Sequence, residues 1–265
     1  MNNCLELKTQ NKTGVDLDQQ LFDHSKSWTL SMWISIHDFT TDEDISIISQ
    51  TNGYSLRYTV AVRSDHCIYS WSGAYGYDKI DSGLKEDTPF HLCIVNDKGT
   101  YKFYINGELK FQKFYTIDNA NTTLGYYANY QYITASIDEF KIYKSILTEA
   151  EIKASMNSNG EDPNLFLMYF NFDTVKDIDG EKYIIDLSSN HKDLLVKNFY
   201  KLEKSFIHFY KFQIKKENKY YNLDLEEVDN KYYFNSVNQL FTKNKNQLTP
   251  INELDTFNLL ILKEN

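Results

Sequence analysis

Residues 27–36 read Ser-Trp-Thr-Leu-Ser-Met-Trp-Ile-Ser-Ile, and from Trp28 onward a large apolar side chain occupies every second position. A period of two is the period of a β-strand, because successive side chains of a strand point to opposite faces of the sheet. One face of this strand is therefore expected to be buried against a second layer. The stretch predicts a strand inside a β-sandwich.

Similar short runs recur on both sides of this stretch, with turn residues between them. They lie at residues 45–49, 54–62, 66–71, 90–95, 100–105 and 136–143. Asn106-Gly107 separates residues 101–105 from 108–111, and this pair favours a two-residue hairpin turn that needs positive φ at both positions. Many short strands in one series predict an all-β sandwich.

One helix is expected within this series of strands. Thr148-Glu149-Ala150-Glu151 fits a capping box, in which the side chains of the first and last residue each bond the other's backbone amide. The polar run over residues 157–163 contains Gly and Pro and would end the helix. Residues 165–172 then resume as an apolar strand.

The composition changes near residue 197, and we expect a domain boundary there. Beyond it Lys, Asn and Tyr become frequent and Gly is absent. The first domain would be the sandwich over residues 1–197, and the second a small β-rich module over residues 198–265. Within the module we expect a β-meander and one last strand. Those four strands are predicted at residues 206–214, 219–225, 231–234 and 257–262.

The charge balance excludes several classes of partner. With 28 Lys+Arg against 37 Asp+Glu, the net charge is −9, and no long basic stripe is present. Nucleic acids and anionic membrane surfaces are therefore not expected as partners. The longest apolar runs, at residues 166–170 and 259–262, are far shorter than the ~20 residues that cross a bilayer. The start lacks a secretory signal, and three dispersed cysteines predict no disulfide framework.

Three segments, in order, carry a family resemblance. They are residues 28–34, residues 90–94 with 101–109, and residues 137–143 with 147–152. They resemble the concanavalin A-like, laminin G-like jelly-roll superfamily, and the last segment, an Asp-containing strand running into a capped helix, is the most specific. Residues 169–173 and 185–190 look like the family's terminal strand phrases. The resemblance covers about residues 5–196 and implies a jelly-roll sandwich with one short helix.

Two further likenesses concern the setting of the protein. The layout is similar to the jelly roll in the receptor-binding half of clostridial neurotoxins, which we interpret as shared fold. Lys219-Tyr220-Tyr221 resembles small C-terminal β modules of phage tail proteins from low-GC bacteria. Together with the missing signal, this implies a virion or phage-tail-like particle that is released by lysis. Non-classical export to the outside of the cell and a cytoplasmic location are the alternatives.

No enzyme is expected. Glucanases of the superfamily carry Glu-x-Asp-x-x-Glu or a close variant on one strand, with an acid and a nucleophile on the same face. This chain has no such run, and the adjacent Asp138 and Glu139 would point to opposite faces. No other hydrolase or phosphate-binding motif is present.

No cofactor is required, although the resemblance implies a possible calcium ion. Its best-matched ligand is Asp138, and Asp16 is a looser candidate. The alternative for Asp138 is that its carboxylate caps neighbouring backbone amides.

Two aromatic clusters are the candidate ligand-binding residues. Residues 69–78 are interpreted as a loop because they contain two glycines, and they hold Tyr69, Trp71, Tyr75 and Tyr77. The second cluster lies around Gly125 and consists of Tyr126, Tyr127, Tyr130 and Tyr132, of which the first three are candidates for ligand binding. Aromatic faces beside polar groups suit sugar rings. The alternative for both clusters is that the tyrosines simply build a face of the sandwich.

The residues thus favour a non-catalytic recognition module that binds a bacterial cell-surface glycan or glycoprotein, and the resemblance of the C-terminal module implies a receptor-binding protein of a phage tail or tail-like particle. Display in several copies would raise its affinity, and a homo-oligomer is one possible form. Two other readings stay open. The first is a structural particle protein that contacts other particle subunits through its tyrosines. The second is a glycoside hydrolase with an unrecognised site.

Overall fold

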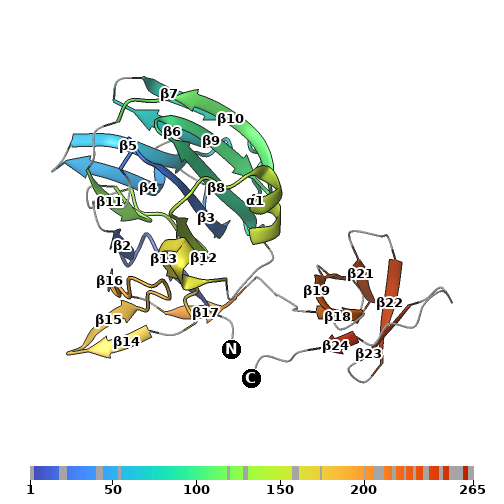
Figure 1. The fold of residues 1–265 in the computed structure, drawn as a ribbon. Coiled ribbons are helices and arrows are strands. Elements are labelled where there is room, and N and C mark those ends of the chain that lie inside the picture. The colour runs from blue at the N-terminus through green and yellow to red at the C-terminus, as the bar shows by residue number, and fades with distance from the viewer. Residues whose placement is uncertain are drawn as a thin grey trace. The chain divides into compact units, whose positions relative to one another are not determined.

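The chain forms two compact units, Met1–Ile207 and His208–Asn265, in the computed structural model (Figure 1). The structure describes residues 3–17, 23–39, 44–52, 55–73, 75–117, 120–127, 131–156, 161–173, 175–199 and 201–205, and beyond residue 205 the backbone of seven strands. Each unit is described by itself.

The first unit is built from two antiparallel sheets that face each other (Figure 1). Its strands are β1 (Asn3–Leu7), β2 (Gly14–Leu17), β3 (Ser27–Ile36), β4 (Ile45–Asn52), β5 (Ser55–Val62), β6 (Ile68–Ser72), β7 (Gly76–Ile80), β8 (Phe90–Asp97), β9 (Thr100–Ile105), β10 (Glu108–Phe114), β11 (Asn121–Leu124), β12 (Ala135–Tyr143), β13 (Phe166–Phe170), β14 (Val175–Ile178), β15 (Glu181–Ile184), β16 (Leu194–Lys197) and β17 (Leu202–Lys204). The described helical segments are α1 (Glu149–Ser155) and the 3-10 turn η2 (Pro163–Leu165).

The two sheets have the mixed strand order of a jelly roll. One sheet runs β10-β9-β8-β3-β12-β1-β17, with β13 added beside β12, and is called the eight-stranded sheet. The other, the nine-stranded sheet, runs β14-β15-β16-β2-β11-β4-β5-β6-β7. The strand predicted over residues 27–36 is confirmed as β3, which lies in the middle of its sheet between β8 and β12. The all-β jelly-roll class is therefore confirmed.

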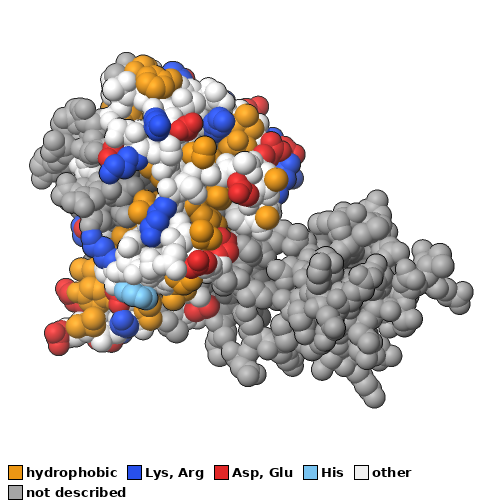
Figure 2. All heavy atoms as spheres, in the orientation of Figure 1, with side chains coloured by type: hydrophobic (Ala, Val, Ile, Leu, Met, Phe, Trp, Pro, Cys, Tyr) orange, Lys and Arg blue, Asp and Glu red, His pale blue; other side chains and the backbone are white. Residues whose placement is uncertain are grey.

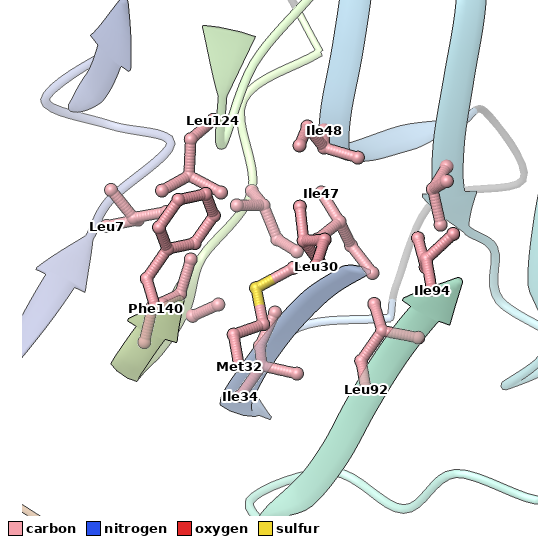
Figure 3. Close-up of a cluster of buried hydrophobic side chains, with 14 of the residues drawn as sticks. Leu7, Leu30, Met32, Ile34, Ile47, Ile48, Leu92, Ile94, Leu124 and Phe140 are labelled. Atoms are coloured by element: carbon pink, nitrogen blue, oxygen red, sulfur yellow. The ribbon is translucent and has the colours of Figure 1, made fainter. Parts of the chain in front are cut away.

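The core lies between the sheets and is made by the apolar face of each strand (Figure 3). Leu30, Met32 and Ile34 of β3 are fully buried, and Leu92 of β8 lies next to them in the same cluster. Phe140 reaches the cluster from β12. Each such side chain contributes about 1.5–3 kcal/mol by burial.

Two local sequence predictions are confirmed at the atomic level. Glu151 N donates to Thr148 Oγ1 at 3.3 Å and Thr148 N donates to Glu151 Oε2 at 2.7 Å, which completes the capping box of α1. Ile152 of this helix is buried against Cys93 and its neighbours, so α1 covers the outer face of the eight-stranded sheet. Asn106 and Gly107 have φ of 50° and 75°, as a two-residue hairpin turn between β9 and β10 requires.

Two other predictions are wrong. The loop predicted over residues 69–78 is a β-hairpin, because β6 and β7 pair in register from Ile68↔Ile80 to Ser72↔Gly76. Residues 185–190, which we predicted to belong to a terminal strand, form a turn instead. The Asp186 carboxylate organises this turn by accepting from Tyr169 N, Ser188 N and Lys192 N at 3.1, 2.9 and 2.9 Å. The three cysteines are all buried, and none of them forms a disulfide.

Strand β17 belongs to the first unit. It pairs antiparallel with β1 through Asn3↔Lys204 and Leu5↔Leu202, and Ser205 Oγ donates to Asp138 Oδ2 of β12. In the second unit the strands form a three-stranded sheet, β19-β18-β24, and a four-stranded sheet, β20-β21-β22-β23. Their bounds are β18 (Phe212–Lys216), β19 (Lys219–Leu223), β20 (Leu225–Val228), β21 (Lys231–Phe234), β22 (Gln239–Asn244), β23 (Gln247–Pro250) and β24 (Leu259–Ile261). Among the described residues, no helix is both long and apolar enough to span a bilayer.

Candidate functional site

One row of side chains crosses the outer face of the nine-stranded sheet. Its members are successive cross-strand partners on β2, β11, β4, β5, β6 and β7: Asp16, Thr123, Ser49, Thr59, Trp71 and Tyr77. Residues directly opposite each other in antiparallel strands share a face. The alternate positions of β5 and β6, such as Val60 and Ile68, belong to the core cluster. The row therefore lies on the face turned away from the core.

The β6–β7 hairpin brings three aromatic rings together at one end of this row. Tyr75 N donates to Ser72 O at 2.9 Å in the turn, and Gly76 takes a φ of +72°, where a side chain would be strained. The ring centroids of Trp71 and Tyr77 are 6.2 Å apart, and those of Tyr69 and Tyr77 are 6.4 Å apart. We call these three residues the aromatic edge.

Exposure differs among the three rings. Tyr77 is 48% exposed, Trp71 is half-buried and Tyr69 is buried at 9%. The rings of Tyr77 and Trp71 are therefore accessible to a ligand, whereas the buried ring of Tyr69 mainly packs against Tyr77.

Arg63 ties the aromatic edge to Asp44. Its guanidinium carbon lies 4.3 Å from the ring centre of Tyr69 and 4.6 Å from that of Tyr77. Arg63 Nε donates to Asp44 Oδ1 at 2.6 Å, and the Tyr77 hydroxyl donates to Asp44 Oδ2. The hydrogen bond to Asp44 raises the pKa of Arg63, and burial together with Asp44 raises the pKa of Tyr77. The ring of Tyr77 is thus held in place by a cation and a carboxylate.

A second carboxylate lies beside Tyr69. Asp65 Oδ2 accepts from the Tyr69 hydroxyl at 2.6 Å and from Lys79 Nζ at 2.8 Å. Burial works against ionisation of Asp65, but the hydrogen bonds from Lys79 and Tyr69 outweigh it and lower the pKa of Asp65. Asp65 is therefore an ionised acceptor at neutral pH.

Tyr75 belongs to a different cluster. It is 39% exposed, its hydroxyl donates to Thr116 Oγ1 at 3.2 Å, and its ring centre lies 5.6 Å from that of Tyr115. Lys113 of β10 pairs with Asp78 of β7 at 2.8 Å. This cluster links the edge strands of the two sheets, which lie side by side in Figure 1. Of the four aromatic candidates at residues 69–78, the structure brings three together and places Tyr75 apart from them.

The second predicted cluster is largely inside the protein. Tyr126 is 3% exposed and stacks on Tyr132 with ring centres 5.1 Å apart. Its ring lies over Gly14, since a Cβ built there would meet Tyr126 Cδ1 at 2.3 Å. Tyr126 therefore has a packing role in the sandwich. Tyr127 is half-buried, and Tyr130 lies outside the described residues.

The two calcium candidates lie on different sheets, each with partners of its own. The Tyr126 hydroxyl donates to Asp16, and Lys197 Nζ pairs with Asp16 at 2.7 Å. Asp138 is fully buried, accepts from Glu139 N at 2.8 Å and from the Ser205 hydroxyl, and burial raises its pKa to about 8. No group of three or more His, Cys, Asp or Glu placed to hold a metal is found among the described residues. Calcium at Asp138 or Asp16 stays a prediction.

Sequence reasoning missed the charged residues of the site. Arg63 and Asp65 follow β5 directly, while Asp44 precedes β4 and Lys79 is in β7. Their contacts depend on the pairing register of three strands, which no local pattern reveals. No local motif joins these charged residues to the aromatic ones, which are separated along the chain by serine and glycine.

The comparisons with known proteins agree with this architecture. A family model described as the concanavalin A-like lectin/glucanases superfamily matches residues 9–153, more than half of the 265-residue chain. The chain belongs to this superfamily. A search of curated protein sequences found no match.

Three solved structures are similar to parts of the chain. A Bacteroides ovatus protein to which carbohydrate binding has been ascribed superposes with a TM-score of 0.61 at 15% identity, over 78% of this chain and 61% of that protein. It shows the same fold, and this chain spans about three-fifths of its length. The CBM40 of a Ruminococcus gnavus sialidase bound to α2,3-sialyllactose gives a TM-score of 0.44 at 16% identity, covering 57% of this chain and 92% of that one. Domain 4 of a Geobacillus stearothermophilus arabinanase in complex with arabinotriose gives 0.40 at 19% identity, covering 49% and 67%.

Proposed function

We propose that this chain is a carbohydrate-recognition module whose ligand lies on the aromatic edge. The observation that carries the proposal is the pairing of Trp71 with Tyr77 on the outer face of the nine-stranded sheet, with Tyr77 48% exposed. A sugar ring stacks its C–H face on an aromatic ring, and this contact adds to the gain from burying apolar surface. Because Arg63 and Asp44 already fix Tyr77, little side-chain entropy would be lost on binding.

Polar groups next to the rings would bind the hydroxyls of the sugar. Asp44 and Asp65 lie within hydrogen-bond distance of the hydroxyls of Tyr77 and Tyr69 respectively. The two oxygens of a carboxylate have about four acceptor positions between them, so the more exposed Asp65 can accept from a ligand as well as from its present partners, while Asp44 holds Tyr77 in place. This combination of a flat apolar surface and a few fixed polar groups is typical of sugar sites.

The surface supports binding without catalysis. A glycoside hydrolase needs one carboxylic acid with a raised pKa to protonate the leaving group. At the aromatic edge the pKa of Asp65 is lowered. The carboxyl with a pKa raised to about 8, Asp138, is fully buried in the eight-stranded sheet. We therefore propose that the module binds and releases its ligand unchanged.

The finer setting that we propose is attachment to a bacterial cell-surface glycan or glycoprotein by a phage tail or tail-like particle. It is supported by the resemblance of Lys219-Tyr220-Tyr221 to C-terminal modules of tail proteins. In such a particle several copies would act together and raise a modest single-site affinity.

A second candidate function is protein contact inside a particle. Strand β10 ends the eight-stranded sheet and exposes Leu109 at 46% and Phe114 at 57%. Exposed apolar side chains on an edge strand favour pairing with another protein.

Binding of the labelled full-length chain to intact bacteria separates these functions. Saturable binding that falls at least about tenfold in Trp71→Ala supports recognition at the aromatic edge, a change equal to about 1.4 kcal/mol. The matched control is Tyr183→Ala, in β15 at the other end of the same sheet, which should bind like the wild type. Equal loss in both variants, or no binding to cells together with defined oligomers that Phe114→Ala dissociates, would reject the recognition function.

A further inference from the structure

We infer that the aromatic edge selects uncharged sugars, and that it discriminates against acidic ones because the cations around it are already occupied. This inference rests on the proposed function and names the chemical class of its ligand. It concerns the ion pairs around the hairpin rather than the rings themselves.

Three cations contact the hairpin, and each is paired with its own carboxylate. Arg63 Nε lies 2.6 Å from Asp44 Oδ1 and Lys79 Nζ lies 2.8 Å from Asp65 Oδ2. Lys113 Nζ lies 2.9 and 2.8 Å from the two oxygens of Asp78. The three pairs sum to zero charge at neutral pH.

Two of the three pairs are also held by neighbouring groups. Arg63 also stacks over Tyr69 and Tyr77, and Asp65 also accepts from the Tyr69 hydroxyl and from Cys67 N at 3.2 Å. An acidic sugar that approached one of these cations would lie next to the carboxylate already paired with it. Its charge would be repelled by that carboxylate, whereas an uncharged sugar meets no such repulsion.

The surroundings also disfavour an anion. The full chain carries a net charge of −9, so the long-range field slows the approach of acidic polymers. Figure 2 shows basic and acidic side chains interspersed over one face of the first unit, with Lys or Arg beside Asp or Glu.

Uncharged sugars suit what the surface does offer. Their hydroxyls are donors, and carboxylates are acceptors only. The side chain of Asp65 is 37% exposed in spite of its partners, so it can accept a hydrogen bond from a hydroxyl of a sugar stacked on Tyr77. A bond of this kind does not depend on charge on the ligand and is weakly affected by salt.

The test is a binding panel with the full-length chain. It contains uncharged polysaccharides (a β-glucan, an arabinan and a galactomannan) and acidic ones (polysialic acid, a polyuronate and a sulfated glycan). We expect binding to at least one uncharged polymer, with an affinity that changes less than about twofold between about 50 and about 500 mM NaCl. Trp71→Ala should abolish this binding, and the acidic polymers should remain unbound.

Asp65→Asn provides an independent arm. The variant removes the partner of Lys79 and should weaken binding of the uncharged polymer about tenfold, the usual order for a lost charged hydrogen bond. It should also create measurable, salt-sensitive binding to the acidic polymers. Asp177→Asn is the matched control, because Asp177 likewise pairs with a lysine, Lys182 at 2.5 Å, and accepts from Gly180 N at 3.0 Å, on the distant β14–β15 hairpin.

The outcomes distinguish the two levels of the proposal. Binding to acidic polymers only, or equal binding to both classes, overturns the inference while carbohydrate recognition stands. No binding to any polymer or cell by a folded wild type overturns the proposed function, and the inference falls with it. An Asp65→Asn variant indistinguishable from Asp177→Asn overturns the role of the ion pairs.

Discussion

At the residue scale, Asp138 shows what burial does to a single carboxyl group. It is fully buried, and two other carboxylates, Glu139 and Asp173, raise its pKa further, while the Ser205 hydroxyl only partly compensates. In the folded chain Asp138 keeps its proton up to a pKa of about 8, whereas in the unfolded chain it loses the proton near the ordinary pKa of an aspartic acid, 3.8. The raised pKa of Asp138 therefore contributes fully to the free energy of unfolding below pH 3.8, and this contribution is lost as the pH rises from 3.8 to about 8.

We predict that Asp138→Asn gains stability relative to the wild type between pH 5 and pH 8. An amide stays neutral throughout, so folding of the variant needs no proton uptake at this position as folding of the wild type does, and the difference should be on the order of 2–5 kcal/mol. Urea unfolding of both proteins at the two pH values measures it. Parallel pH profiles would show that Asp138 does not titrate in this window.

The same pair of proteins tests the calcium prediction. A hard cation would favour the ionised carboxylate, so it would raise the unfolding midpoint of the wild type at pH 8 and leave Asp138→Asn unchanged. We expect no such selective shift, because the partners of Asp138 in the structure are a hydroxyl and a backbone amide. A wild-type midpoint that rises with added calcium and falls with chelator would establish the site.

Gly14 gives a prediction from close packing. A Cβ at this position would lie 2.3 Å from Cδ1 of the buried Tyr126 ring, so Gly14→Ala should destabilise the fold by about 1–3 kcal/mol. Thermal unfolding is the measurement. Gly73→Ala is the control, since its nearest neighbour in space is a Trp71 atom at 3.5 Å, an ordinary contact. Equal midpoints for the two variants would contradict the packing of Tyr126 over Gly14.

At the element scale, the hairpin β6–β7 explains why the candidate site was only partly visible in the sequence. The aromatic residues are apparent in the chain, and their two glycines favour a loop. Pairing with β5 nevertheless extends the ladder to residue 72, and only the turn around Gly73 remains outside the strands. Strand alternation then turns Tyr69 and Trp71 to one face, while Tyr75, in the turn, contacts Thr116 instead. The pairing of β6 with its neighbouring strands therefore makes residues 69–78 a hairpin, which local composition does not reveal.

Helix α1 was predictable because its signal is local. Both reciprocal bonds of the capping box form between residues three apart. We predict that Thr148→Ala lowers the free energy of unfolding by about 1 kcal/mol, the usual value for a lost N-cap. Thr148→Ser keeps the hydroxyl and should cost much less, as urea unfolding can show. Equal losses in the two variants would mean that the methyl group, and not the cap, carries the effect.

At the scale of the whole molecule, the fold class was predictable and the site was predictable only in part, for one physical reason. The alternation along β3 and the turn at Asn106-Gly107 can each be recognised in a stretch of at most ten residues, and such signals suffice to predict a β-sandwich. The row from Asp16 to Tyr77 needs the register of six strands, whose pairings join residues up to about a hundred positions apart. The apolar core sets that register because a slip of one residue would expose it.

The last prediction concerns where the first unit ends. All the described core residues lie before residue 207, so the chain cut after residue 207 should unfold within about 2 °C of the full-length protein. A cut after residue 197 removes β17, leaves β1 as an edge strand, and takes the Ser205 hydroxyl from the buried Asp138. It also removes Asn198, whose carbonyl accepts from Thr13 Oγ1 at 3.0 Å. The shorter chain should therefore melt at least about 5 °C lower. Equal midpoints for the two truncations would place the end of the folded unit at residue 197, and a loss of folding in both would mean that the sandwich depends on the C-terminal residues.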